Sequence, residues 1–287
     1  MPVIIRDGFR LNYQDVGSGV PVVLIMGTGG SGRAWHLHQV PAMVAAGHRV
    51  VTFDNRGVSP SDNSPPDFTV DHMAADTAAL IEHLGIGPCA VVGTSLGARI
   101  AAELALSRPE LVSRLVLMAA RGRSDAMSTA LTRAERELED LGIELPPQYR
   151  AVVQVLQQLS RRSLSDDQRT TDWLEVFELS TSAESAVRAQ RGLYPMPDRL
   201  PAYRGIRAPS HVISFADDVL APPSAGREIA TAIPDSMFRV VDGCGHIGYL
   251  EHPDTVNRAL LEALSPERAP GAAVTQGPGA PTPVPVS

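Results

Sequence analysis

A serine, two aspartates and a histidine, residue types that together can cleave an acyl bond, follow one another along this chain of 287 residues. Ser95 lies in the G-x-S-x-G pattern at 93–97, Asp217 and Asp218 come later, and His246 follows them. A serine hydroxyl is a weak nucleophile until a base removes its proton, and a carboxylate is needed to orient that base. The residue set therefore predicts nucleophilic catalysis by Ser95, with His246 as the base.

The pattern around Ser95 also has the spacing that a sharp strand-to-helix turn requires. An apolar run at 89–92 comes before it, and a helical segment is expected at 95–107. Gly93 and Gly97 would let the strand and the helix pass close to each other, and the helix would point its first amides toward charge that develops during attack. This context favours a nucleophile on a tight turn.

The aspartates and the histidine follow two later strand candidates. Asp217 and Asp218 come just after the apolar segment 211–215, and His246 comes after the segment 238–241. Because the carboxyl ends of parallel strands meet at one edge of a sheet, we expect these side chains to lie beside Ser95.

The elements that must position these residues alternate between strands and helices. We expect an edge strand at 9–16 and further strands at 22–25, 48–53, 89–92, 115–118, 211–215 and 238–241. Helices are expected at 33–46, 70–84, 95–107, 223–232 and 253–264. This order predicts an α/β fold, with a mostly parallel, doubly wound sheet covered by helices on both faces.

The alternation stops between 121 and 204, where helical periodicity occurs at 127–141, 149–159 and 171–179. We expect an α/β core at 1–120 and 205–264, a helical cap at 121–204, and a disordered tail at 265–287 that has almost no large apolar residue. A cap would exclude water and supply apolar walls to a substrate pocket. The candidate pocket residues are Trp35, Trp173, Phe177, Tyr194, Met196, Val219 and Ile247. The charged run 133–140 is expected to be a solvated helix face with i,i+4 pairs.

Composition excludes several functions. The formal net charge of −7 provides no basic face for nucleic acid, and no apolar run reaches the length that spans a bilayer. All 25 basic residues are arginine, so a lysine Schiff base and a P-loop lysine are impossible. Cys89 and Cys244 lack a metal-ligand spacing, and the first residues lack a signal-peptide pattern, so we expect a cytoplasmic protein with no metal and no organic cofactor.

From about 9 to 264 the chain resembles the α/β-hydrolase superfamily. The family's acid stands four residues before a proline, and 218–222 fits this pattern, which favours Asp218 over Asp217. Some members take the acid from the loop after an earlier strand, where Asp125 is the candidate here. The resemblance implies that the amides of Thr28 and Leu96 form an oxyanion hole. It also implies a structural role for 54–62, which is similar to the family's D-x-R-G-x-G-x-S pattern with Ser59 in place of the second glycine.

At 26–27 a Met-Gly pair replaces the family's common His-Gly, and this variant is similar to methylesterases of secondary metabolism. The resemblance implies that the protein is a serine hydrolase acting on an ester or activated acyl bond of a small, apolar metabolite. Elimination, acyl transfer, cyclisation and carbon–carbon bond hydrolysis are enzymatic alternatives on the same fold. A small-ligand receptor is the non-enzymatic alternative. The oligomeric state stays open.

Overall fold

The computed structural model describes residues 2–63, 67–179, 188 and 190–265. Its centre is an eight-stranded sheet in the order β1-β2-β4-β3-β5-β6-β7-β8. The strands from β4 to β8 in this order are parallel, whereas β1 and β2 are antiparallel to their neighbours. The strands are β1 (Val3–Arg6), β2 (Phe9–Val16), β3 (Val20–Ile25), β4 (His48–Phe53), β5 (Cys89–Thr94), β6 (Val112–Met118), β7 (Ser210–Phe215) and β8 (Ser236–Val241).

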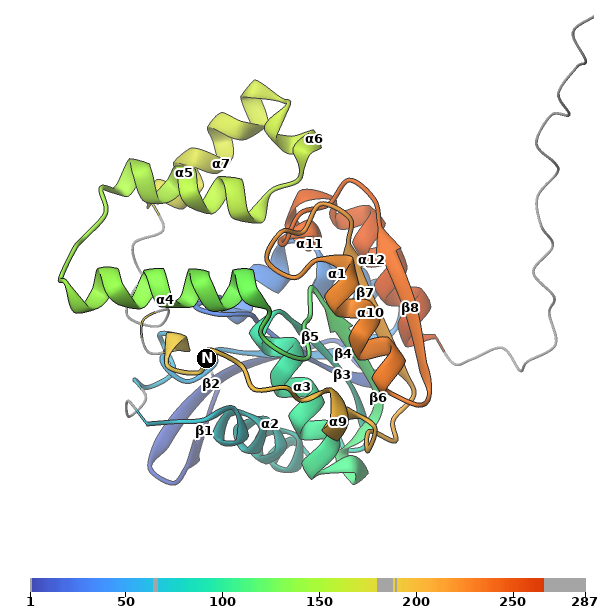
Figure 1. The fold of residues 1–287 in the computed structure, drawn as a ribbon. Helices are drawn as coiled ribbons and strands as arrows, with labels where there is room; N and C mark the ends of the chain where they lie inside the picture. The colour runs from blue at the N-terminus through green and yellow to red at the C-terminus, as the bar shows by residue number, and fades with distance from the viewer. Residues whose placement is uncertain (1, 64–66, 180–187, 189, 266–287) are drawn as a thin grey trace, which may run out of the picture.

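Helices cover both faces of this sheet (Figure 1). Strand residues alternate between the two faces, so Val23 and Val91 belong to one apolar core and Val22 and Val92 to the other. The first core is closed by α2 (Val70–Leu84), α3 (Leu96–Ser107), α9 (Leu200–Tyr203) and α10 (Pro223–Ala232). The second is closed by the 3-10 turn η1 (Gly32–Leu37), α1 (Gln39–Ala45), α11 (Gly248–Glu251) and α12 (Pro253–Leu264). A second 3-10 turn, η2 (Pro109–Leu111), leads into β6.

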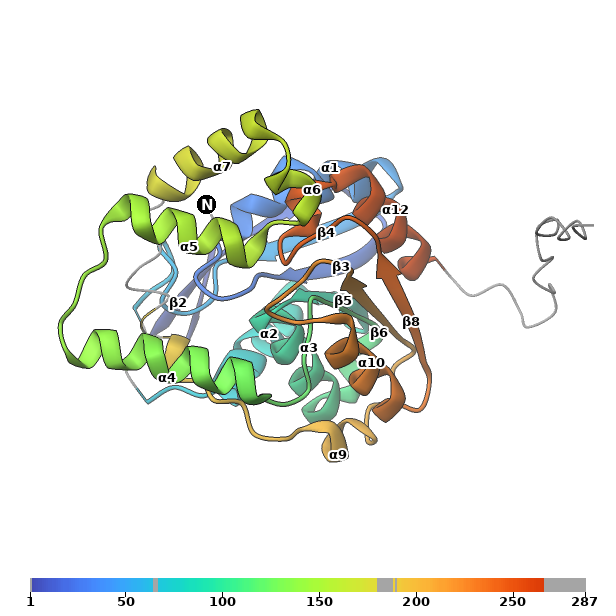
Figure 2. The same cartoon turned by 45° about the horizontal axis from the view of Figure 1, so that its top comes forward.

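Among the described helices between β6 and β7, four lie above the sheet, as Figures 1 and 2 show in green and yellow. They are α4 (Ala126–Asp140), α5 (Pro147–Gln158), α6 (Arg161–Leu164) and α7 (Asp167–Leu179). Three of them match the helices expected at 127–141, 149–159 and 171–179, and the short α6 was not expected. We call α4 to α7 the cap helices. The expected tail at 265–287 lies outside the described residues except for Ser265.

Two expectations near the amino terminus were wrong. The strand expected at the sheet edge, β2, has β1 outside it, because Asp7 and Gly8 adopt positive φ and turn the chain into a hairpin. The helix expected at 33–46 is divided at His38 into η1 and α1. Pro41 has no amide hydrogen and its ring would collide with the carbonyl four residues earlier, so one continuous helix is disfavoured.

The charged run 133–140 differs from expectation in part: Arg133, Arg136, Glu137 and Asp140 are exposed as expected, but the ion pairs are not i,i+4 pairs. Glu135 and Glu139 on α4 form ion pairs with Arg191, which is far away in the chain, and Arg136 donates to the backbone oxygen of Tyr194. This face of α4 is therefore a contact between the cap and the segment that leads back to the core.

Candidate active site

Ser95 occupies a strained backbone position between β5 and α3. Its φ of 54° and ψ of −118° are rare for a residue with a side chain. A Cβ built on Gly93 would lie 2.1 Å from the Gly97 oxygen, and one built on Gly97 would lie 2.2 Å from the Ile25 oxygen. Both glycines are therefore required sterically, and α3 begins at Leu96, directly after the serine, rather than at Ser95 as expected.

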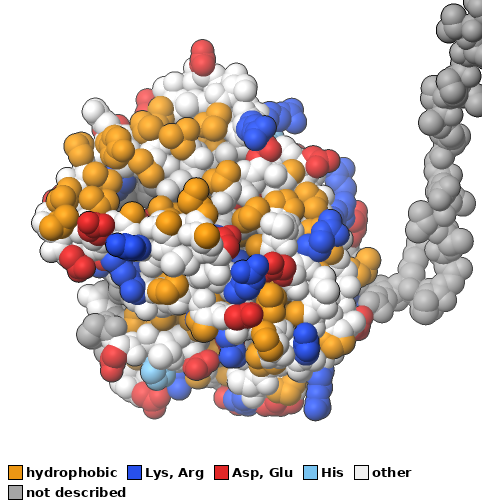
Figure 3. Space-filling model, in the orientation of Figure 1, with side chains coloured by type: hydrophobic (Ala, Val, Ile, Leu, Met, Phe, Trp, Pro, Cys, Tyr) orange, Lys and Arg blue, Asp and Glu red, His pale blue; other side chains and the backbone are white. Residues whose placement is uncertain are grey.

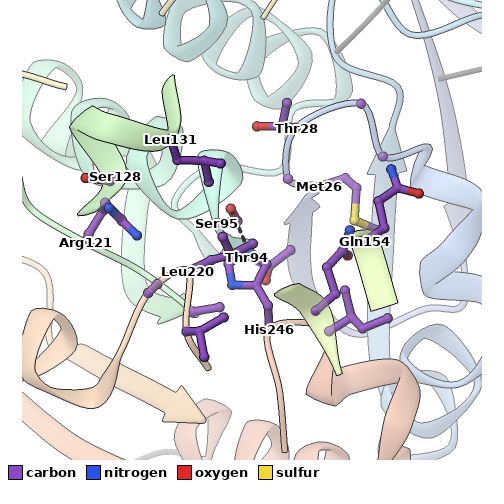
Figure 4. A pocket seen from close by; sticks show the side chains of 18 of the residues that line it. Met26, Thr28, Thr94, Ser95, Arg121, Ser128, Leu131, Gln154, Leu220 and His246 are labelled. Atoms are coloured by element: carbon purple, nitrogen blue, oxygen red, sulfur yellow. Dashed lines mark hydrogen bonds between the residues drawn. The ribbon is translucent and has the colours of Figure 1, made fainter. Parts of the chain in front are cut away.

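Hydrogen bonds join Ser95, His246 and Asp218. His246 Nε2 lies 3.0 Å from Ser95 Oγ (Figure 4). His246 Nδ1 lies 2.8 Å from Asp218 Oδ2. The Asp218 side chain is fully buried, and that of His246 is 12% exposed. With Nδ1–H donating to the carboxylate, Nε2 is left free to accept the serine proton. The arrangement is that of a base placed to activate a serine hydroxyl.

The loop after β7 distinguishes the aspartates. Oδ1 of Asp218 accepts hydrogen bonds from the backbone amides of Leu220 and Ala221, both at 2.8 Å, which leaves Oδ2 facing His246. Asp217 instead accepts from the Arg161 amide at 3.2 Å. Of the two neighbours, Asp218 is the one that contacts the histidine.

Asp125 serves a different structural purpose. Its side chain accepts from the Ser128 amide at 2.7 Å and caps the start of α4. The hydrogen bond from this amide is the main cause that keeps the pKa of Asp125 below its ordinary value. Asp125 lines the same cavity as Ser95, but it makes no hydrogen bond to His246.

Glu251, which sequence reasoning missed, connects the histidine loop to the cap. Its Oε2 accepts from the Gly245 amide at 2.6 Å, while Oε1 accepts from the amide and the hydroxyl of Ser160, both at 2.8 Å. Ser160 lies between α5 and α6, so the buried carboxylate joins the residue before His246 to a turn of the cap.

The loop after β3 carries Thr28, one of the two expected oxyanion residues, and is held at several points. Asp54 Oδ1 accepts from the Ser31 hydroxyl at 2.7 Å and from the Gly32 amide at 2.9 Å. Asn55 donates to the Met26 oxygen at 2.9 Å. These contacts confirm the structural role expected for the 54–62 pattern.

Gln190, a second residue that sequence reasoning missed, holds the same loop from the opposite side. It is fully buried, accepts from the Gly29 amide at 2.8 Å and donates to the Arg56 oxygen at 3.1 Å. The Leu96 amide, the other expected oxyanion donor, is the first of α3 and directly follows Ser95. Thr28 lines the cavity together with Ser95 and His246 (Figure 4).

A cavity of about 480 Å³ opens onto Ser95 and His246. Its walls come from the strand ends and from the cap helices, with Leu131 of α4 and Gln154 of α5 among them. Of the residues expected in a substrate pocket, it is lined by Trp173, Phe177, Tyr194, Met196, Val219 and Ile247. Trp173 and Phe177 stack with ring centroids 5.7 Å apart.

Trp35 was the one wrong pocket residue. Its side chain is fully buried and packs on Tyr249 with ring centroids 4.9 Å apart, so it belongs to the second apolar core. Tyr249 also donates to the Met26 sulfur at 3.5 Å. The Met-Gly variant of this loop thus places an apolar side chain over an aromatic cluster.

The outer surface of the cap is also rich in apolar side chains, which gather over α4 and α5 in the upper left of Figure 3. The exposed large apolar side chains of the cap and of the loops between its helices are Met127, Leu141, Ile143, Tyr149, Val152, Leu156, Val176 and Leu179. Of these, Met127 and Val176 also line the cavity. Leu179 is 81% exposed and is not among the residues that line the cavity.

Comparison with protein families agrees with the fold. The model of the alpha/beta hydrolase fold matches residues 20–253. The chain belongs to the α/β-hydrolase family. This membership confirms the fold class expected from the sequence, and the family relatives show that the α/β hydrolase described here is an enzyme.

Its relatives have several names. The α/β hydrolase is 48% identical over 261 residues to the Mycobacterium tuberculosis protein named "Putative non-heme bromoperoxidase BpoC", covering 91% of this chain and 99% of that one. The crystal structure of that relative superposes with a TM-score of 0.85, over 90% of this chain and 96% of the other. A 2-hydroxy-6-oxononadienedioate/2-hydroxy-6-oxononatrienedioate hydrolase of Burkholderia vietnamiensis is 28% identical, over 91% of this chain and 93% of its own length.

A thermophilic esterase from Thermogutta terrifontis has a TM-score of 0.77 at 25% identity and covers 92% of this chain and 97% of that one. Within the described ranges of the α/β hydrolase, no group of three or more His, Cys, Asp or Glu side chains could hold a metal ion. No helix among those residues is both long and apolar enough to cross a bilayer. Cys89 and Cys244 are buried and unpaired, as expected for small core residues.

Proposed function

We propose that this α/β hydrolase cleaves an ester or activated acyl bond of a small, largely apolar metabolite, with Ser95 as the nucleophile. The observation that carries the proposal is the hydrogen-bonded series from Ser95 through His246 to the buried Asp218, at the floor of an apolar cavity. A series of this kind argues against a receptor, because ligand binding does not need an activated hydroxyl.

In the first half of the proposed reaction, Ser95 Oγ attacks the acyl carbon while His246 Nε2 takes the hydroxyl proton. The new oxyanion accepts hydrogen bonds from the amides of Thr28 and Leu96. The bond to the leaving group then breaks, and His246 gives its proton to the departing oxygen. Asp218 stabilises the histidine while it is positively charged.

In the second half, water attacks the acyl carbon held on Ser95. His246 takes a proton from that water and returns it to Ser95 Oγ, which releases a carboxylic acid and restores the enzyme. The cap helices keep bulk water from the cavity until the leaving group has departed. We propose a cytoplasmic location as well, since free buried cysteines are typical of a reducing compartment.

A serine-directed phosphonate tests the nucleophile. We expect labelling of Ser95 in the native enzyme, loss of labelling in Ser95→Ala, and loss of turnover in that variant with substrate binding retained. Turnover in heavy-oxygen water should place one labelled oxygen in the acid product. An elimination, transfer or cyclisation enzyme would release a product without that label, and full activity of Ser95→Ala would exclude a covalent serine mechanism.

Carbon–carbon bond hydrolysis is a second candidate, favoured by the relative that is named for a 6-oxo dienedioate. In such a compound the oxo carbon has carbon on both sides, so hydrolysis there breaks a carbon–carbon bond. Paired assays with an ester and a ketone of the same chain length distinguish the two functions, because an esterase will turn over only the ester.

The name of the 48% identical relative suggests a further assay. If hydrogen peroxide replaced water in the second half of the reaction, Ser95 would release a peracid, which oxidises bromide to hypobromite and returns the carboxylic acid. Bromination that requires the carboxylic acid, peroxide and Ser95 together would support this side activity. Bromination by Ser95→Ala would contradict it.

A further inference from the structure

Arg121 places a positive charge in the cavity that contains Ser95. It follows β6 by three residues, at the end of the sheet where the cavity opens, and its side chain is 16% exposed. Figure 4 shows Arg121 beside Ser128 on the α4 side of the cavity, with Ser95 and His246 across from it. A bound molecule that reaches Ser95 could therefore also contact this guanidinium.

The other arginines that line the cavity have more contacts. Arg191 forms ion pairs with Glu135 and Glu139. Arg99 donates from Nη1 to the Leu193 oxygen at 2.9 Å, although its Nε has no hydrogen-bond partner within the described part of the chain. Both guanidinium groups are thereby anchored to the cap or to the segment that follows it.

Arg121 is held less tightly, by one long ion pair to Asp125. Its Nη1 atom is buried and has no hydrogen-bond partner among the described residues. The nearest carboxylate oxygen, Oδ1 of Asp125, lies 3.7 Å away and accepts the Ser128 amide at 2.7 Å. Asp125 thus balances part of the charge but leaves a donor without an acceptor, which is costly for a guanidinium in an apolar wall.

A carboxylate from a ligand would correct this deficit. Its negative charge would contact the exposed part of the guanidinium and balance the charge that Asp125 offsets only in part. Hydrogen bonds between charged groups are about twice as strong as those between neutral ones. A neutral carbonyl would satisfy the donor geometry but would add little to the charge balance. The arrangement at Arg121 therefore favours an acid over an amide or an ester at this position.

We propose that Arg121 binds a carboxylate of the substrate, so that the substrate is an acyl compound with a free acid group remote from the bond attacked. This inference rests on the proposed function for the identity of the attacked bond, but not for the binding of the acid. It assigns the substrate class as half-esters of dicarboxylic acids and related acid-bearing acyl compounds.

Binding to Ser95→Ala tests the assignment without turnover. The probes are monomethyl adipate and methyl adipamate, which differ only in a terminal carboxylate or carboxamide, together with the homologous pairs from succinate to sebacate. We expect the acid of the best-fitting pair to bind at least about tenfold more tightly by calorimetry, as for one hydrogen bond between charged groups. Adding Arg121→Gln should abolish this preference and change binding of the carboxamide little.

Matched variants make each outcome decisive. Arg123→Gln removes an equal charge two residues away, where Arg123 pairs with Glu228 at 2.6 Å outside the cavity, and it should retain the preference. Arg121→Lys keeps the positive charge and should retain part of the preference for the acid. Circular dichroism checks that every variant is folded. Equal binding of acid and amide throughout the series, no binding at all, or a preference that survives Arg121→Gln would overturn the assignment.

The same proteins keep this test separate from that of the proposed function. If the phosphonate fails to label Ser95 but the acid preference depends on Arg121, the proposed function is wrong and the binding site stands. If Ser95 is labelled and esters are hydrolysed without any acid preference, the proposed function stands and the assignment of Arg121 is wrong.

Discussion

Glu251 accepts a hydrogen bond from the amide of Gly245, and this contact fixes the backbone directly before His246. The same carboxylate accepts from Ser160 in the cap, so the loop that carries the histidine and the turn between α5 and α6 share one buried acceptor. A Cβ on Gly245 would lie 2.4 Å from the Gln158 oxygen, so loop and cap are in close contact here. The position of His246 therefore depends on the cap.

Glu251→Gln should lower kcat by at least about tenfold, because an amide NH₂ would replace one of the two acceptors and face the donors of Gly245 or Ser160. We expect KM to change less than kcat, and phosphonate labelling of Ser95 to slow by a similar factor. Glu262→Gln, which removes an exposed carboxylate paired with Arg239, is the control and should leave both rates unchanged. A fall in melting temperature with normal labelling would show that Glu251 has only a structural role.

Asp218→Asn should reduce activity by up to about ten-thousand-fold, since an amide at this position disfavours the tautomer that His246 needs. Asp217→Asn should stay within about threefold of the native enzyme, because the Asp217 side chain accepts the Arg161 amide, an interaction that an asparagine oxygen can keep. The comparison requires kcat/KM for both variants on one ester. Equal losses in the two variants would show that both aspartates act by supporting the loop after β7, and that the contact between Asp218 and His246 is not decisive.

Gln190→Ala should lower kcat by about tenfold with little change in KM, because the Gly29 amide and the Arg56 oxygen would lose their partner and the loop with Thr28 would lose a constraint. Gln190→Glu keeps the acceptor for Gly29 but loses the donor to Arg56, so its rate should fall between those of the native enzyme and the alanine variant. If Gln190→Glu were slower than Gln190→Ala, the contact between Gln190 and the Gly29 amide would not be what supports the rate.

Gly97→Ala should destabilise the protein by more than about 3 kcal/mol, because its Cβ would collide with backbone of β3 that cannot move away. Gly142→Ala is the matched control: its φ is +63° and nothing lies within 4 Å, so only backbone strain of about 1 kcal/mol is expected. Urea unfolding of both variants measures the difference. A small effect at Gly97 would mean that the turn can relax.

Cys89 and Cys244 should not react with thiol reagents in the folded protein at pH 8. Burial raises the pKa of both thiols to about 12, so only about one molecule in ten thousand carries a thiolate at that pH. Reaction should appear together with unfolding in urea. Fast reaction of the native enzyme would show that one of these cysteines is accessible.

Local sequence patterns predicted most of the core and the reacting groups. The G-x-S-x-G pattern, the D-x-x-x-P spacing at Asp218 and the glycines around His246 each describe a turn, and a turn depends mainly on residues a few positions apart. Strand and helix periodicities depend on equally short spacings, which is why α2, α10 and α12 have the bounds expected from the sequence. The mistakes at β1 and at Pro41 were also local, and their signals are visible in the sequence.

Tertiary structure alone decided which side chains face the cavity and which support the loops around it. Trp35 and Trp173 are both large aromatic residues, yet one is buried against Tyr249 and the other lines the cavity. Gln190 meets Gly29 across 161 positions, and Glu251 meets Ser160 across 91.

Contacts of this kind leave no periodic trace in the sequence, because a hydrogen bond depends on where two distant backbones come together and not on the residues beside each partner. The sequence by itself determined the fold class and the candidates Ser95, His246 and the pair Asp217 and Asp218, since turns and alternating apolar residues specify them locally. The resemblance to the α/β-hydrolase superfamily favoured Asp218 within that pair. The packing of the cap on the sheet decided which side chains line the cavity and left the buried Arg121 Nη1 atom without an acceptor among the residues that the structure describes. Both outcomes depend on tertiary structure, because the walls of the cavity come from segments that are far apart in the chain.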